Sequence, residues 1–428
     1  MQETEQKQII ALIKREVVPA IGCTEPVAVA LCTARACEAL GTRPEQIEVW
    51  LSANILKNAM GVGIPGTGGM IGLPIAVALG ALIGKSEYQL EVLKETTPEA
   101  VEAGKRLINA RAIRIALKEG ITGKLYIEVA CRAGGHEARA IISGGHTTFI
   151  YIARDNEVLL DKQSASTAAA DTSDEPVLTL RRVYDFAVTA PLDEIAFILE
   201  ARRLNKAAAE RSLADGRYGH ALGNTLARMQ GTSGKSSFLR ILSYTSAACD
   251  ARMAGAPFPV MSNSGSGNQG ISATLPVVIY AEEHGATEEQ LTRALILSHL
   301  TAIYIKQHMG RLSALCGCVV AATGSSCGIT YLMGGDYRQI SFAAQNMIAN
   351  LTGMICDGAK PGCALKVTSG VSTALLSAML AMEQKTVTSV EGIIEDNVDL
   401  SIRNLARIGS EGMNETDRMV LEMMTGKE

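Results

Sequence analysis

The feature that most constrains the fold is a change of hydrophobic period along the chain. Between residues 124 and 160, short runs of alternating apolar and polar residues are separated by glycine pairs and by Asp155-Asn156, which predicts a small antiparallel sheet. From Pro191 to the C-terminus, apolar residues recur at helical spacing. We therefore expect an α+β fold, with a large, mainly helical domain and a small antiparallel β-sheet domain.

Start and stop signals divide the chain into three expected parts. Thr24 has the residue type of a helix N-cap, Glu25 and Pro26 suit the first turn, and Gly41 suits the end of the same helix. We expect N-terminal helices that pack on the large helical domain, an α+β domain that contains the sheet, and the helical domain itself. These parts span residues 1–45, 46–190 and 191–428, respectively.

Composition and charge restrict the classes of partner that the protein is expected to bind. The 428 residues carry a formal net charge of −4, so the basic patch expected of a nucleic-acid-binding protein or of one bound to an acidic membrane is missing. The N-terminus is polar, and the longest apolar stretch, residues 71–84, is too short to span a bilayer. We expect a cytoplasmic protein that binds neither nucleic acid nor membrane. In that compartment, the ten cysteines are better interpreted as metal ligands, reactive thiols or buried thiols than as disulfides.

A short turn carries two of these cysteines, Cys356 and Cys363, and a third thiol lies upstream at Cys316. Three thiolates can hold an iron–sulfur cluster and leave one iron open to a substrate. Burial as ordinary core thiols is an equally good interpretation of Cys356 and Cys363. Cys318 competes with Cys316 for the third position, and spacing alone does not choose between them.

Cys23 directly precedes the proposed N-cap Thr24. A thiol beside the unpaired N–H groups of a helix start has a lowered pKa, which favours a thiolate that can act as a nucleophile or a base. The negative charge of the neighbouring Glu25 works against this effect. A purely structural Cys23 is the alternative.

The loop from Ser262 to Gly270 is rich in Ser, Asn and Gly and has apolar flanks. Its backbone N–H groups and side chains suit a small anion such as a carboxylate, and the alternative is a solvated loop. Its candidate binding residues are Asn263, Ser264, Ser266 and Asn268. A GxGxxG pattern at 61–66 lacks the context of a dinucleotide site. His146 lies in a polar turn that could reach a site.

Six short motifs together resemble the L-cysteine desulfidase family, which is related to the α-chain of iron–sulfur L-serine dehydratases. They occur in the family's order and cover essentially the whole chain. The motifs are GCTEP at 22–26, PGTG at 65–68, SGGHT at 143–147, SNSGSGNQG at 262–270, RLSALC at 311–316 and GMICDG at 353–358.

The resemblance implies an oxygen-sensitive [4Fe-4S] lyase that converts L-cysteine into sulfide, ammonia and pyruvate without pyridoxal phosphate. It implies that Cys316, Cys356 and Cys363 are the cluster ligands and that Cys23 is the base that removes the substrate's α-proton. Residues 191–428 would then be the catalytic, cluster-binding domain. One iron would remain open for the leaving group.

Further expectations concern the substrate and the alternatives. The Ser262–Gly270 loop is expected to hold the carboxylate of a small amino-acid substrate, with Asn58 and His146 as weaker candidates for the same pocket. An L-serine or L-threonine dehydratase with the same cluster is the nearest alternative. A non-catalytic protein that binds a metal or a thiol ligand is the alternative from a different class. A homodimer is a further possibility that the residues leave open.

Overall fold

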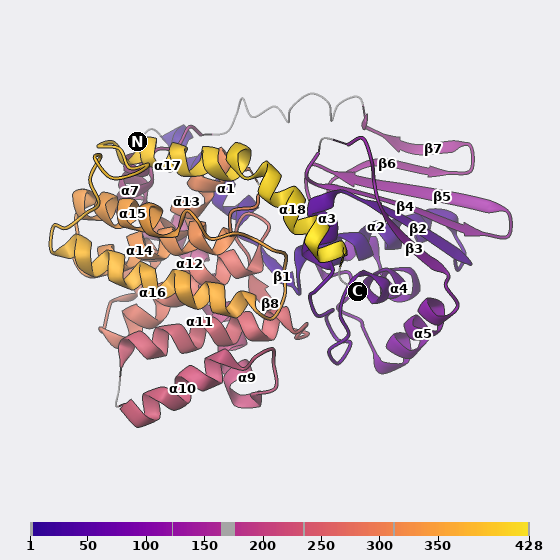
Figure 1. Cartoon of the computed structure of the whole chain (residues 1–428), viewed down its shortest axis with the longest axis horizontal. Helices are drawn as coiled ribbons and strands as arrows, with labels where there is room; N and C mark the ends of the chain where they lie inside the picture. The colour runs from indigo at the N-terminus through magenta and orange to yellow at the C-terminus, as the bar shows by residue number, and fades with distance from the viewer. Residues whose placement is uncertain (1–2, 122, 164–175, 234–235, 311–312, 427–428) are drawn as a thin grey trace.

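The structure is a computed structural model, and it describes residues 3–121, 123–163, 176–233, 236–310 and 313–426. Residues 311 and 312, which begin the RLSALC motif, lie outside the described residues. Figure 1 shows two halves side by side, a sheet with its own helices on the right and a group of long helices on the left. The predicted α+β class is therefore confirmed.

The larger sheet has six strands in the order β3-β2-β4-β5-β6-β7. Its strands are β2 (Gln46–Leu51), β3 (Ile113–Leu117), β4 (Tyr126–Ala133), β5 (His136–Ser143), β6 (Phe149–Arg154) and β7 (Glu157–Asp161). Neighbouring strands are antiparallel except β2 and β3, which are parallel. The expectation of a purely antiparallel sheet is corrected at this edge, because the chain between β2 and β3 crosses over through helices and returns in the same direction.

One face of this sheet is covered by helices and the other carries charges. The helices on this face are α2 (Thr24–Leu40) and α4 (Leu73–Ile83), and α5 (Pro98–Asn109) packs on α4. On the opposite face, Glu128 of β4 is 2% exposed and accepts hydrogen bonds from Lys118, Tyr126 and Arg139. This alternation of apolar and polar faces is what period-2 strands produce when one side is buried.

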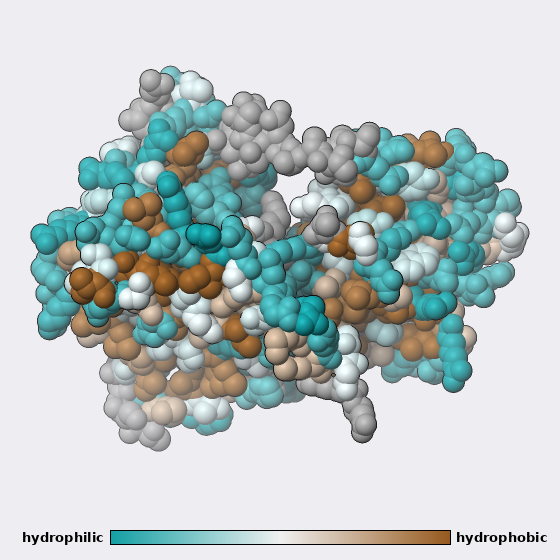
Figure 2. Space-filling view, turned by 45° about the horizontal axis from the view of Figure 1, so that its top comes forward, coloured by the Kyte–Doolittle hydropathy of each residue, from teal (hydrophilic) through white to brown (hydrophobic). Residues whose placement is uncertain are grey.

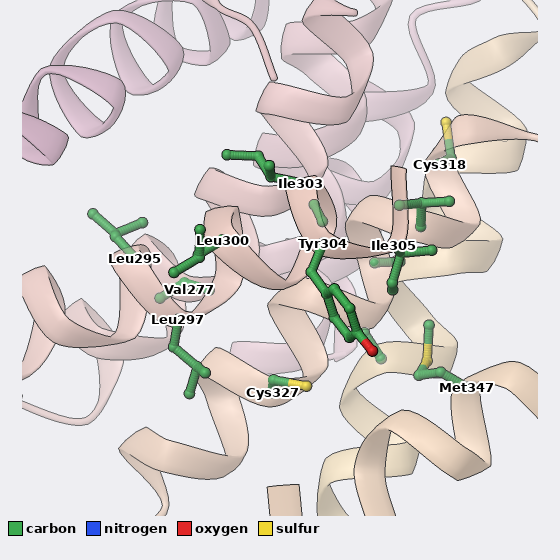
Figure 3. Packing of buried hydrophobic residues seen from close by; sticks show 14 of the residues in the cluster. Val277, Leu295, Leu297, Leu300, Ile303, Tyr304, Ile305, Cys318, Cys327 and Met347 are labelled. Carbon is green, nitrogen blue, oxygen red and sulfur yellow. The ribbon is translucent and has the colours of Figure 1, made fainter. Parts of the chain in front are cut away.

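The other half is built almost entirely of helices. They are α7 (Leu180–Thr189), α8 (Leu192–Ile195), α9 (Leu199–Asp215), α10 (Leu222–Ser233), α11 (Ser237–Met253), α12 (Gly267–Glu283), α13 (Glu288–Met309), α14 (Gly317–Leu332), α15 (Tyr337–Leu351), α16 (Cys363–Met382) and α17 (Val398–Arg407). Figure 3 shows Tyr304 of α13 in the core, near Cys327 and Met347. Its buried hydroxyl donates to Asp399 Oδ1 at 2.8 Å, so the polar atom is satisfied.

Helix boundaries follow the predicted signals in most places. Gly41 ends α2 with a φ of 75°, which glycine adopts without strain. Thr287 begins α13 with a capping box to Gln290. Residues 388–397 form turns and bends, and the helix that follows them begins only at Val398.

Several segments connect the two halves, among them two short strands and a helix. The short strands β1 (Pro19–Ile21) and β8 (Pro259–Met261) pair antiparallel. Helix α18 (Asn414–Thr425) runs from the helical half to α3 (Ala53–Ala59), as Figure 1 shows in yellow. The segments that carry the predicted site residues therefore meet where the halves join.

Exposed apolar side chains gather on the helical half. Figure 2 shows hydrophilic residues over the outer end of the sheet and several hydrophobic ones over the helices. Among the described residues, α16 is the one helix long and apolar enough to cross a membrane, and half of its apolar window is buried inside the protein. Core helices of globular proteins have the same length and composition.

Candidate functional site

The cysteine turn and the segment before α14 are joined by backbone hydrogen bonds. Leu315 and Ile355 form an isolated antiparallel bridge. Cys316 N donates to Met354 O at 2.9 Å, and Cys356 N donates to Ala314 O at 2.6 Å. Cys316 and Cys356, 40 positions apart in the sequence, are thereby held on adjacent strand-like segments.

The third predicted thiol lies at the start of a helix. Cys363 is the first residue of α16, and its Sγ lies 3.6 Å from Gly358 O. Cys316 is the N-cap residue of α14. Two of the three thiols therefore occupy helix N-termini, where unpaired N–H groups favour negative charge.

The electrostatic surroundings of these thiols differ. A hydrogen bond from Cys318, together with the charge of Lys366, lowers the pKa of Cys316 to about 7 although burial opposes the shift. Burial raises the pKa of Cys363 to about 11 and also raises that of Cys356. Of these three thiols, Cys316 is therefore the one that ionises most easily.

Two further cysteines belong to the same neighbourhood. Burial and the nearby Cys363 raise the pKa of Cys249, a fully buried residue of α11. Cys318 is 5% exposed, and its pKa is raised by its hydrogen bond to Cys316 and by burial. The pKa values of the two residues that compete for one position are therefore shifted in opposite directions.

A buried lysine connects the cysteine turn to α3 and α18. Lys57 is 1% exposed, and its Nζ donates to Cys356 O at 3.3 Å and forms an ion pair with Asp417. Asn54 Nδ2 donates to the other Asp417 oxygen at 2.6 Å. Because a buried ammonium is costly without a partner, Asp417 of α18 fixes Lys57 beside the turn.

The start of α2 also contacts α3. Cys23, rather than Thr24, is the N-cap residue, and Cys23 Sγ lies 3.9 Å from Asn58 O. Burial and the negative charge of Glu25 raise the pKa of Cys23 well above its ordinary value. The expectation that the helix start lowers this pKa is therefore wrong, because desolvation and the carboxylate outweigh the helix dipole.

Glu25 accepts most of the hydrogen bonds in this cluster. Its Oε2 accepts from Cys23 Sγ and from Thr24 Oγ1, both at 3.0 Å, and its Oε1 accepts from Asn58 Nδ2 at 3.2 Å. His146 Nε2 lies 4.0 Å from Oε1. Asn58 and His146 are both predicted as weaker candidates for substrate binding. Both approach the carboxylate of Glu25, which Cys23 also contacts.

The loop before α12 contacts the same cluster. Thr24 Oγ1 donates to Gly265 O at 2.8 Å, which brings the starts of α2 and α12 together. Asn268 Oδ1 accepts from Arg252 Nη1 at 3.0 Å, and Ser266 is the N-cap of α12. The predicted anion loop is therefore buried at a helix N-terminus rather than solvated.

Two of the predicted loop residues have other hydrogen-bond partners. Asn263 is fully buried, and its Nδ2 contacts His299 Nδ1 and His299 O at 3.1 Å each. Ser264 Oγ donates to Asn263 Oδ1 at 2.8 Å. Asn263 and Ser264 therefore hold the loop on α13, whereas Ser266 and Asn268 lie at the end nearer Cys23.

Unsatisfied polar atoms gather between the two thiol regions. Among the described residues, Asn58 Oδ1, Arg252 Nε and Gln269 Oε1 are buried and have no hydrogen-bond partner. The side chain of Gln269 packs against Gly317, next to Cys316. Buried polar groups are nearly always paired, so these three atoms are available to form hydrogen bonds with a polar ligand.

Sequence reasoning missed several residues of this region. Arg252, Lys57 and Cys249 come from helices whose patterns show only a buried face. Glu25 was considered only as a charge that disfavours a thiolate. A buried charged residue on an apolar helix face is the signal that could have drawn attention to Lys57 and Arg252.

Sequence comparisons with known proteins extend over all the residues of the candidate site. A family model described as the serine dehydratase alpha chain matches residues 87–422. A UPF0597 protein of Bacteroides fragilis is 73% identical over 433 residues, and a UPF0597 protein of Oleidesulfovibrio alaskensis is 48% identical over 430 residues. Both matches cover 100% of this chain and 100% of the relative. The chain belongs to the serine dehydratase alpha-chain family, together with the UPF0597 proteins that it matches over their full length.

Proposed function

We propose that the protein is an iron–sulfur-dependent, pyridoxal-phosphate-independent lyase that eliminates sulfide from L-cysteine. Its family membership supports a lyase-type activity. The observation that carries the proposal is the backbone pairing that brings Cys316 and Cys356 together beside Lys57 of α3, whose next residue, Asn58, lies beside Cys23.

The donor set is compatible with a cluster held by Cys316, Cys356 and Cys363. Thiolates are the usual ligands of iron–sulfur clusters, and each of these thiols interacts electrostatically with at least one of the other two. Among the described residues, no group of His, Cys, Asp or Glu is close enough to hold a single metal ion. A cluster distributes its ligands over several irons, so its thiols can lie farther apart than the ligands of one ion.

The chain's own residues support an elimination from an α-amino acid. Arg252 and the N-terminus of α12 suit the substrate carboxylate, since both offer N–H donors. Asn58 Oδ1 can accept a hydrogen bond from the substrate ammonium. Cys23 is proposed to contact the α-proton. When bound, the cluster would supply an open iron that stabilises the departing sulfur as a Lewis acid.

An anaerobic assay tests this proposal. Reconstituted protein is expected to release sulfide from L-cysteine at a higher rate than it releases pyruvate from L-serine. A higher rate on serine would replace the desulfidase assignment with that of a serine dehydratase, which the family match favours as the second candidate. If the protein takes up a cluster but acts on neither substrate, the remaining interpretation is a non-catalytic ligand-binding protein.

A further inference from the structure

The strongest additional observation is the buried pair of Cys23 and Glu25. Glu25 is 8% exposed and Cys23 is 2% exposed, and the thiol donates to the carboxylate at 3.0 Å. Thr24 and Asn58 donate to the same carboxylate, so its oxygens are held in place from three sides. The thiol proton of Cys23 is thereby directed at the carboxylate of Glu25.

The negative charge lies on Glu25 and not on Cys23. Burial alone would raise the pKa of Glu25, but the charges of His146 and Arg252 and the hydrogen bond from Cys23 hold it below its ordinary value. The pKa of Cys23 is shifted in the opposite direction. A proton acceptor must be able to hold an added proton, and a neutral thiol can do so only if it gives its own proton away at the same time.

We propose that Cys23 relays the substrate's α-proton to Glu25, which makes Glu25 the terminal base of the elimination. As the α C–H bond breaks, its proton forms a new S–H bond on Cys23, while the original thiol proton forms an O–H bond on Glu25 Oε2. The C–H electron pair becomes the new carbon–carbon double bond, and the β-substituent leaves with the electrons of its own bond. Cys23 is a thiol before and after the step, so no free thiolate forms.

The surroundings of Glu25 allow its proton to leave afterwards. His146, from the turn after β5, lies 4.0 Å from the oxygen that does not bind Cys23. Arg252 of α11 is the charged group that faces the pair, and Asn58 of α3 and the Thr24 hydroxyl complete its polar neighbours. Arg252, and His146 when it is protonated, favour the ionised carboxylate, which is the state that the next turnover requires. The relay rests on the proposed function, because it assigns a role within that elimination.

Glu25→Gln separates the relay from a simple thiolate base. The amide removes a negative charge beside Cys23, so the variant lowers the pKa of Cys23 and enlarges the thiolate fraction. A thiolate base would then work as well as before, or better, at neutral pH. The relay instead predicts that kcat falls by about a hundredfold at neutral pH, that KM changes little, and that activity partly returns at alkaline pH, where Cys23 ionises by itself. Wild-type turnover in Glu25→Gln at neutral pH would overturn the relay.

A second measurement needs no cluster and no turnover. Thiolate absorbance of the cluster-free protein is followed against pH, and the part lost in Cys23→Ala is assigned to Cys23. The ionisation of Cys23 is expected to move to lower pH in Glu25→Gln, and an unchanged midpoint would show that the proton is not shared. Glu128→Gln, which neutralises a buried carboxylate on the sheet face far from Cys23, is the matched control and should change neither the midpoint nor the pH profile. Wild-type protein that is inactive on cysteine and serine would overturn the proposed function and the catalytic relay, whereas the absorbance shift would still report the shared proton.

Discussion

The protein places buried thiols in both halves, and their surroundings are opposite. In the sheet half, Cys37 of α2 and Cys131 of β4 lie with their Sγ atoms 3.5 Å apart. The hydrogen bond with Cys37 and burial raise the pKa of Cys131. In the helical half, Cys316 is the N-cap of α14, near Lys366, and its pKa is lowered to about 7.

The difference shows that burial alone does not decide what a cysteine can do. Both groups pack against apolar cores. In the helical half, Cys316 combines a helix N-terminus with the charge of Lys366 and its pKa is lowered, whereas burial raises the pKa values of Cys356 and Cys363. Positive charge and free N–H groups stabilise thiolates, and thiolates are the form that binds metals.

The largest difference between the thiols of the two halves is expected in how much their substitution lowers the iron–sulfur content of the protein. Cys356→Ser or Cys363→Ser should lose most of the iron and sulfide that wild-type protein takes up during anaerobic reconstitution, because each removes a proposed ligand. Cys37→Ser in the sheet half is the matched control and should bind as much iron as wild type. Equal iron content in Cys356→Ser and Cys37→Ser would remove the distinction between the two groups.

A second difference is expected between two cysteines of the helical half, Cys316 and Cys318. Cys316→Ser should lose the cluster, whereas Cys318→Ala should keep most of it, since the pKa of Cys318 is raised while that of Cys316 is lowered. Iron content and the visible absorbance of the reconstituted proteins measure the difference. The reverse result would make Cys318 the third ligand.

A third test concerns how the cysteine turn is anchored. Asp417→Ala leaves the 1% exposed Lys57 without its carboxylate partner, and losing one member of a buried pair destabilises a protein by about 3 kcal/mol. Chemical denaturation of the cluster-free protein measures this free energy. Lys105→Ala, which breaks an exposed pair with Glu102, should change it by less than about 1 kcal/mol.

The smallest effect is a difference in alkylation of the cluster-free protein. Cys316, with a pKa of about 7, is half ionised at neutral pH, and its thiolate is lost as the pH falls below 7. Its reaction with iodoacetamide should therefore slow about fivefold between pH 7 and pH 6, as followed by peptide mass spectrometry. Cys131, whose pKa is raised, should hardly react at either pH, and equal rates for the two thiols would contradict the contrast.

Local signals predicted local structure well. The end of α2 at Gly41 depends on residues close in sequence, and this prediction is confirmed. The parallel pairing of β2 and β3 was missed because it depends on a crossover, which periodicity does not reveal.

The site was predictable only in part. Cysteine spacing and motifs suggested Cys316, Cys356, Cys363 and Cys23, and those assignments remain predictions. The polar contacts of Cys23 could not be predicted, because desolvation depends on which segments cover it, and Asn58, His146 and Arg252 come from distant parts of the chain. No local pattern encodes that convergence.

The ion pair between Lys57 and Asp417 also sets an order of assembly. Ribosomes make the N-terminal residues first, so Lys57 is made early, Cys316 to Cys363 follow, and Asp417 comes only after all the proposed ligands. During synthesis, Lys57 has no counter-charge until α18 has emerged and docked on α3. The link between α3 and α18 therefore forms only after the whole segment that carries the proposed ligands has been made.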